Sequence, residues 1–293
     1  MVAMSGVLGR SSRREHAWDG ASPSASDVLV VDIGRIITLL WLATAIVLGL
    51  AILREFVISI IGTGTALKDL RHFSLDSEHS LPAWYESATM LASAGLLTIL
   101  AALARHDDPR NRLPWMLLAI IFLLMSIDEL VAFHEGSMRP LREAFHLTGI
   151  FYFLWVIIAA PLLVALAIYF VPFMLRLPRP TAVRFFIAGA IFVSGAFGME
   201  FIGGYYVSFA GYDYLPYRIA STCEESLEII GMTLFLSSLL RHLAEVAPVL
   251  QVTMKQWVSP LVPAKAGIKG PQTQQPIIPL PDSRFRGNER GLF

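Results

Sequence analysis

Four ionisable residues follow a long apolar stretch of this sequence and lie within a few positions of one another. Segment 113–136 begins as an uninterrupted apolar run and then contains Asp128, Glu129, His134 and Glu135. An ionised side chain within a lipid bilayer is costly, so ionisable residues inside a membrane span are rare and usually functional. We therefore expect this segment to supply part of a functional site.

Acidic residues also occur inside three other apolar segments. Glu200 lies in one of them, and Glu224, Glu225 and Glu228 lie in another. With a rise of about 1.5 Å per helical residue, these acids and Asp128 fall at similar depths, about 15–20 Å below the same membrane surface. Unrelated positions need not agree in depth, so the agreement predicts one shared cluster.

Glu86 lies in a fourth apolar segment, at a shallower depth of about 6 Å. Trp84 and Tyr85 precede it and fit the aromatic belt found at membrane interfaces. Glu86 is therefore either a member of the cluster or an ordinary interfacial acid.

Carboxylates brought together by several helices, with histidine nearby, are typical of metal sites in helix bundles. The metal would be divalent zinc, iron or copper, and the residue types do not choose among these. None of the expected spans contains the Glu-x-x-His pair of di-iron bundles. We expect His134 and Glu135 to serve as catalytic proton shuttles or as further ligands. The predicted metal ligands are Asp128, Glu129, Glu200, Glu224, Glu225 and Glu228.

Two other uses of the acids stay open. They are part of a proton or cation pathway, or they are structural groups that pair with arginine or bond to Ser and Tyr. Like charges this close are unstable, so either some carboxyl groups are protonated or a cation is present.

The composition is that of a polytopic membrane protein. Of the 293 residues, 55% are hydrophobic and only 16% are charged, and the mean hydropathy is +0.60. The net charge is zero and no dense basic block occurs, which argues against a nucleic-acid partner. The single cysteine, Cys223, excludes an intrachain disulfide, and we expect it to be a packed small side chain.

The predicted fold is an all-α bundle of six transmembrane helices within residues 34–245. Each apolar segment is near or above the ~20 residues that cross a bilayer. Residues 1–33 and 246–293 lack apolar periodicity, and we expect a disordered N-terminal arm and a disordered C-terminal tail. The expected spans are 35–61, 82–105, 113–137, 149–175, 182–209 and 214–242.

Lysine and arginine residues are more frequent in the segments on the side of the N-terminus. By the positive-inside rule, both termini are then cytoplasmic and the acids lie in the outer half of the membrane. His106 and His242 fall near the inner surface, and we expect ordinary exposed residues there. Glu55 beside Arg54 predicts either an ion pair at a helix end or a solvated charge.

The residues Ser126, Asp128, Glu129, His134 and Glu135 form a Ser-x-Asp-Glu-x4-His-Glu pattern. It resembles a helix of uncharacterised bacterial polytopic membrane proteins, and the resemblance covers one span of the six. It implies a multi-pass protein of the bacterial inner membrane and brings no activity with it.

Two functions follow as hypotheses. The first is a divalent-metal-dependent membrane enzyme that acts on a lipid or an apolar small molecule. The alternative is a proton- or cation-coupled transporter or channel, although the expected helices are continuous except for a hint of a break at Pro161. An assembly or scaffold subunit is a third class, and the oligomeric state is left open.

Overall fold

The computed structural model describes residues 31–62, 66–77, 79–133, 136, 145–153 and 155–248, with only the backbone at 66–69 and 105–107. In this part of the chain the regular structure is entirely helical, which confirms the predicted all-α class. The expected disordered arm and tail fall almost wholly outside the described residues.

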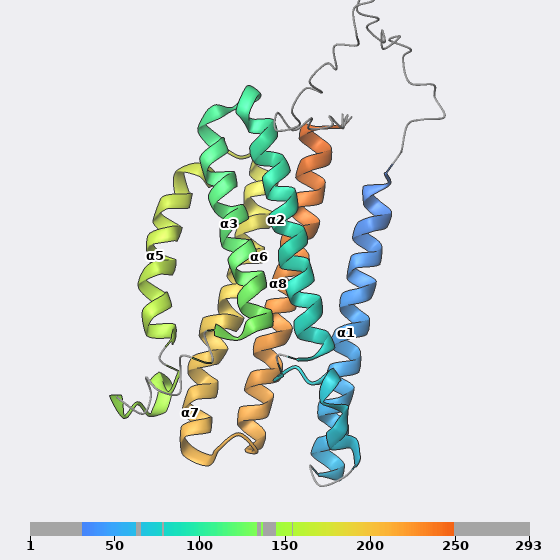
Figure 1. Cartoon of the computed structure of the whole chain (residues 1–293), viewed down its shortest axis with the longest axis vertical. Helices are drawn as coiled ribbons and strands as arrows, with labels where there is room; N and C mark the ends of the chain where they lie inside the picture. The colour runs from blue at the N-terminus through green and yellow to red at the C-terminus, as the bar shows by residue number, and fades with distance from the viewer. Residues whose placement is uncertain are drawn as a thin grey trace, which may run out of the picture. The chain divides into compact units, whose positions relative to one another are not determined.

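Six helices are long and apolar enough to cross a membrane, as predicted (Figure 1). The protein is thus an integral, multi-pass membrane protein. Five spans are single helices, and one combines α6, the π-helical segment η4 and α7. The bounds are α1 Ile33–Ile61, α2 Leu81–Asp107, α3 Pro109–Val131, α5 Trp155–Met174, α6 Arg179–Val193, η4 Ser194–Met199, α7 Glu200–Ala210 and α8 Leu215–Val246.

Local sequence signals set the helix ends. The side chain of Asp32 caps α1 by accepting from the Arg35 amide, and Ser80 caps α2 by accepting from the Ala83 amide. Helices α1 and α7 stop where Gly62 and Gly211 adopt positive φ angles, a conformation that glycine tolerates best. The 3-10 helix η2, Ala66–Phe73, then connects α1 to α2.

Helix α8 packs against α1, α2, α6 and α7, and α2 packs along α3. Glycine allows the closest of these approaches: a Cβ atom on Gly231 of α8 would lie 2.8 Å from the amide nitrogen of Phe192 in α6. Between α1, α2 and α8, the Thr44 hydroxyl lies 2.8 Å from both the Tyr85 and the Thr233 hydroxyl. These contacts make α8 the central helix of the bundle.

Helix α5 is much less packed than the others. Its buried side chains are Val156 and Phe173, which stand near its two ends. The rest of this helix presents apolar side chains outward, as a lipid-facing span does.

One end of the bundle is an apolar layer, at the level where α2 ends and α3 begins. Trp115 packs edge-on against Phe173 at 4.7 Å, and Phe122 stacks on Phe235 at 4.6 Å. We call the following buried residues the apolar layer: Leu97, Leu100, Trp115, Phe173, Phe185, Phe235 and Leu239. The opposite end, where α1 stops and α8 starts, is called the η2 end.

His242 corrects a sequence expectation, because it is buried in this layer and not exposed at the surface. Its ring lies 5.5 Å from the Trp115 ring, and its Nδ1 has no hydrogen-bond partner among the described atoms. Helix α8 extends to Val246, so His242 is still inside a packed helix, where its ring serves as an aromatic surface.

The third span also ends earlier than predicted. Helix α3 stops at Val131 because Ala132 adopts a left-handed conformation, with φ 59° and ψ 40°. His134 and Glu135 themselves lie outside the described residues.

The break in the helices occurs at a different place from the one the sequence suggested. Pro161 lies inside α5, which continues past it, whereas Ser194–Met199 forms a π-helical stretch within the fifth span. Such π-helical insertions are rare and are often found at functional sites. This one ends directly before Glu200.

Candidate functional site

Glu86 on α2 is the most deeply buried acid of the bundle. Only 1% of its surface is exposed, and its Oε1 atom has no hydrogen-bond partner among the described atoms. Its charge interacts with those of Glu129, Glu225 and Glu228. In the described part of the chain, no lysine or arginine forms an ion pair with Glu86. The interpretation of Glu86 as an interfacial acid is wrong.

A pair of serines sets the distance between α2 and α3 beside these acids. The Ser87 hydroxyl donates to the Ser126 carbonyl at 2.8 Å, and the Ser126 hydroxyl donates to the Ser87 carbonyl at 3.0 Å. Ser87 directly follows Glu86, and Ser126 precedes Glu129 by three residues, so it lies near Glu129 on the surface of α3. The small side chains thus bring the two carboxyl groups toward each other.

Helix α8 contributes three acids on neighbouring turns. Glu224, Glu225 and Glu228 are each half-buried. Charge interactions connect Glu225 with Glu228, Glu129 and Glu200, and connect Glu228 with Glu129 and Glu200. We call these acids the carboxylate cluster: Glu86, Glu129, Glu200, Glu224, Glu225 and Glu228.

Glu200 is held at the first turn of α7 and is 8% exposed. The indole Nε1 of Trp155, from the start of α5, donates to its Oε1 at 2.8 Å. Glu200 also interacts electrostatically with Glu224 of α8.

The π-helical segment packs directly against the acids of α8. A Cβ atom on Gly195 would lie 2.8 Å from the Glu224 carbonyl oxygen and 3.0 Å from Cγ of Glu228. A residue without a side chain is therefore needed at this contact. The close approach sets the distance between Glu200 and the acids of α8.

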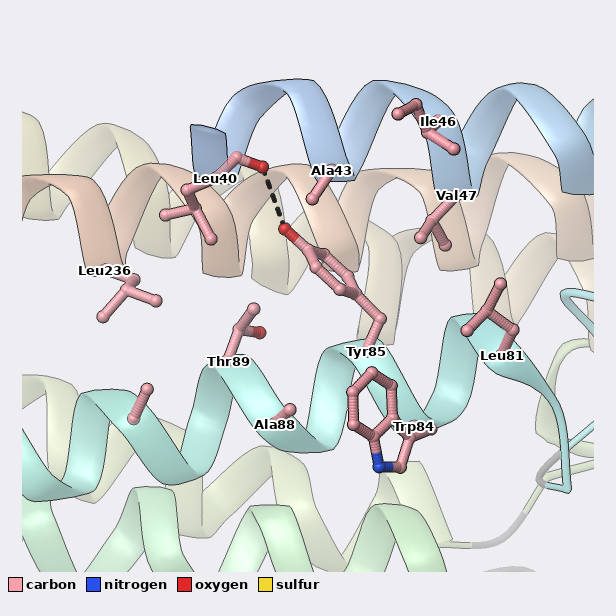
Figure 2. Close-up of a pocket in the computed structure, with 11 residues that line it drawn as sticks. Leu40, Ala43, Ile46, Val47, Leu81, Trp84, Tyr85, Ala88, Thr89 and Leu236 are labelled. Carbon is pink, nitrogen blue, oxygen red and sulfur yellow. Dashed lines mark hydrogen bonds between the residues drawn. The ribbon is translucent and has the colours of Figure 1, made fainter. Parts of the chain in front are cut away.

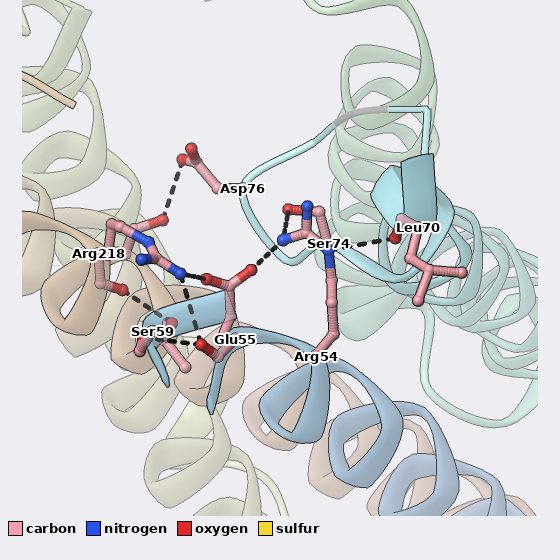
Figure 3. A network of polar contacts seen from close by, with 9 residues as sticks. Arg54, Glu55, Ser59, Leu70, Ser74, Asp76 and Arg218 are labelled. Carbon is pink, nitrogen blue, oxygen red and sulfur yellow. Dashed lines mark hydrogen bonds and ion pairs between the residues drawn. The ribbon is translucent and has the colours of Figure 1, made fainter. Parts of the chain in front are cut away.

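A network of hydrogen bonds and ion pairs connects η2 and the segment after it to α1, and connects α1 to α8 (Figure 3). Arg54 donates to the Leu70 carbonyl at 3.1 Å and to the Ser74 hydroxyl at 2.9 Å. Glu55 pairs with Arg54, as predicted, and also with Arg218 of α8 at 2.7 Å. These charged side chains are mostly buried, so the network is a defined structural element.

Asp76 completes the site at its exposed end. Its Oδ1 accepts hydrogen bonds from the Tyr217 hydroxyl at 3.2 Å and from the Ser221 hydroxyl at 3.0 Å. Its charge interacts with that of Glu225. Asp76 is exposed, whereas Glu225 is half-buried and Glu86 is fully buried.

Among the residues with described side chains, no group of three His, Cys, Asp or Glu is arranged to hold a metal ion. His72, His79 and His146 are exposed. Cys223 is exposed, although the sequence predicted a packed side chain. The described cluster is thus a set of carboxyl groups alone.

The sequence matches a family over residues 37–243, a range that reaches into all six spans and includes the whole carboxylate cluster. The chain belongs to this family. It is described as a domain of unknown function, DUF8692. No curated protein and no solved structure matched the chain.

Five of the predicted metal ligands interact electrostatically in pairs, but as described they form no arrangement that could hold a metal ion: Glu129, Glu200, Glu224, Glu225 and Glu228. Asp128 is half-buried on α3 and lies about 100° around the helix axis from Glu129. His134 and Glu135 fall on residues that the structure does not describe.

Trp155 and the serine pair were not predicted as parts of the site. Asp76 lies outside the apolar spans, so a search for acids inside spans does not make it a candidate ligand. Ser87 adjoins Glu86, and Ser126 is close to Glu129 in the sequence. This spacing was the one sequence signal that could have indicated the serine pair. Nothing in the sequence connects Trp155 to Glu200, because the bond joins positions 45 residues apart.

An apolar groove runs along a different face of α2, between α1 and α2 (Figure 2). Its volume is about 490 Å³. Tyr85 and Thr89 bring hydroxyl groups to its lining, and both are used within the protein: Tyr85 donates to the Leu40 carbonyl and Thr89 to the Glu86 carbonyl. The groove therefore offers hydrocarbon surface. Further lining residues are Ala43, Ile46, Val47, Leu81, Trp84, Ala88, Ala92 and Leu236.

Proposed function

We propose that this protein is a membrane-embedded enzyme that depends on a divalent cation at the carboxylate cluster. Its substrate would be a lipid or another apolar small molecule. The cluster lies between helices that span the membrane, so such substrates reach it from the lipid phase. A bound metal would supply Lewis acidity or an activated water, and the carboxyl groups would supply general acid and base.

The observation that carries the proposal is the environment of Glu86. A fully buried carboxyl oxygen without a described partner faces three other carboxyl groups. Burial of a polar group without a partner is unfavourable, and several carboxylates together repel one another. A cation relieves both costs at once.

The described residues do not form a ready-made metal site, and the proposal therefore requires the carboxyl groups to converge when a cation binds. Glutamate side chains have the rotatable bonds for this, and Glu225 and Glu228 are only half-buried. Zinc, iron and copper stay the candidate metals, and His134 and Glu135 stay proposed as additional ligands or proton shuttles.

The proposed setting is the bacterial inner membrane, with both termini in the cytoplasm and the η2 end facing outward. The distribution of lysine and arginine supports this orientation. The resemblance of the Ser-x-Asp-Glu-x4-His-Glu pattern to bacterial membrane proteins supports the bacterial setting.

A proton- or cation-coupled transporter is the second candidate, because the π-helical segment before Glu200 interrupts a span next to the cluster. Transporters often bind ions where a helix is broken. The apolar layer weighs against this candidate, since its aromatic and aliphatic side chains fill the other half of the bundle. Catalysis at a site open to one side needs no path through that layer.

Metal analysis of the purified full-length protein tests the proposal. The protein is stripped with chelator, reloaded separately with Zn²⁺, Fe²⁺ or Cu²⁺, and compared with Glu225→Gln and Glu228→Gln. We expect one of the metals to be retained, with affinity reduced at least about tenfold in both variants. Glu245→Gln is the matched control, because Glu245 lies on the same helix and pairs with Arg184 near the opposite end.

Activity is then sought by incubating the loaded protein with liposomes of a membrane lipid extract and following lipid masses. Products that form with the parent protein and not with Glu225→Gln support the enzyme. If the protein retains no metal and instead moves protons in a proteoliposome flux assay, the transporter hypothesis replaces the enzyme hypothesis.

A further inference from the structure

A polar stripe runs along α8 from the η2 end toward the middle of the bundle. Tyr217, Ser221, Glu225 and Glu228 follow one another at spacings of four, four and three residues, which places them on one helix face. The polar face of α8 therefore connects the exposed end of the site with its depth.

Asp76 stands at the exposed start of this stripe. It accepts from the first two members, Tyr217 and Ser221, and its charge interacts with that of the third, Glu225. Glu225 in turn interacts with Glu228, and both interact with Glu86. The carboxyl groups thus form a continuous series that ends at the unpartnered Oε1 of Glu86.

The position of Asp76 is fixed by contacts that do not involve the cluster. Arg54 bonds to Leu70 and Ser74, which precede Asp76, and the Glu55–Arg218 pair joins α1 to α8 beside it (Figure 3). An exposed carboxylate held in place over a buried set of carboxyl groups is well positioned to attract cations.

The stripe ends inside the bundle. Beyond Glu228, Gly231 is in close contact with Phe192, and Met232 and Phe235 are buried. The apolar layer begins there, so the series of carboxyl groups has one open end.

We infer that small cations reach the carboxylate cluster through this stripe from the η2 end, with Asp76 as the first group that binds them. The inference rests on the proposed uptake of a cation by the cluster and adds the route and its outermost residue. Asp76 acts here on the rate of arrival, whereas the final binding site lies around Glu86, Glu225 and Glu228.

The test measures the rate of radioactive Zn²⁺ uptake by the full-length protein in detergent, with rapid filtration at low and high salt. Asp76→Asn keeps an oxygen acceptor for Tyr217 and Ser221 but removes the charge. We expect uptake to slow by about tenfold at low salt, with less slowing at high salt and an unchanged amount bound at equilibrium. Asp76→Glu restores the charge and should recover most of the rate.

Asp213→Asn is the matched control, because Asp213 is another exposed acid at the η2 end, in the turn before α8. We expect its uptake rate to stay within about twofold of the parent rate, since the charge lies off the stripe. A thermal unfolding scan of each variant identifies any loss of folded protein.

The possible results separate the two proposals. If Asp76→Asn takes up Zn²⁺ as fast as the parent, or Asp213→Asn slows it equally, the route is wrong while cation binding by the cluster stands. If the parent protein takes up no Zn²⁺ and no other divalent metal, the proposed function and the route both fail.

Discussion

Ser87 and Ser126 donate their hydroxyl groups to each other's backbone carbonyls, so that two hydrogen bonds close α2 against α3. Enlarging one partner should separate the helices at the level of the carboxylate cluster. We expect Ser126→Leu to destabilise the protein by about 1–3 kcal/mol through overpacking. Ser126→Ala removes only hydrogen bonds and should cost about 1 kcal/mol or less. Thermal unfolding in detergent measures both, and equal losses would contradict the role assigned to the close contact.

Gly195 provides a test of the contact between η4 and α8. A Cβ atom there would lie 2.8 Å from the Glu224 carbonyl oxygen, which is too close for any side chain. We expect Gly195→Ala to cost about 1–3 kcal/mol by forcing the π-helical segment away from α8. Gly198→Ala, in the same segment, is the control, because nothing lies within 4 Å of its added Cβ atom. A similar drop in melting temperature for both variants would contradict the prediction, because the contact with α8 would then not explain the need for glycine at position 195.

Trp155 should support Glu200 through its indole N–H. Trp155→Phe keeps the aromatic packing against Phe197 but removes the donor. Loss of a bond to a carboxyl group costs about 1–3 kcal/mol, so the variant should unfold at lower temperature. Trp84→Phe serves as the comparison, because Trp84 is 59% exposed and should change stability by less than about 0.5 kcal/mol. If the two variants melt alike, the bond to Glu200 contributes nothing measurable.

Glu55 should contribute more to stability than the acid of an ordinary surface ion pair. Glu55→Gln leaves Arg54 and Arg218, both largely buried, without their charged partner. We expect a loss of about 1–3 kcal/mol, lower than for a fully buried pair because the side chains retain some contact with solvent. Glu245→Gln breaks the more exposed pair with Arg184 and should cost less than about 1 kcal/mol. Chemical denaturation in mixed detergent micelles would rank the two, and the reverse order would refute the prediction.

His242 should be replaceable by an apolar aromatic residue. His242→Phe keeps a ring beside Trp115 and removes an Nδ1 atom that has no partner among the described atoms. We expect the melting temperature to be unchanged or higher, because replacing an unsatisfied buried polar group is neutral or stabilising. A marked decrease would indicate that the imidazole makes a polar contact important for folding.

The six spans could be predicted because membrane crossing depends on length and apolar composition, which are local properties of the sequence. The charge interactions among Glu200, Glu225 and Glu228 were also accessible, since similar depth follows from position along each helix. Depth alone failed for Glu86: its shallow position suggested an interface, but α2 buries it against α3 and α8.

The remaining differences depend on tertiary contacts. The left-handed residue Ala132 ends α3 without a glycine or proline to signal it. The π-helical turn arises where Gly195 meets α8, and the bond from Trp155 to Glu200 joins helices far apart in the chain. Each sequence pattern describes a single helix, so it does not predict contacts between helices.

The buried side chains of helix α5, Val156 and Phe173, lie near its two ends, and Trp155 at its start bonds to Glu200, whereas the described side chains between them are half-buried or exposed. Its central turns are therefore under little constraint beyond remaining hydrophobic and helical. Substitutions in these turns should leave the carboxylate cluster undisturbed, and this makes α5 the natural place to attach a spectroscopic label.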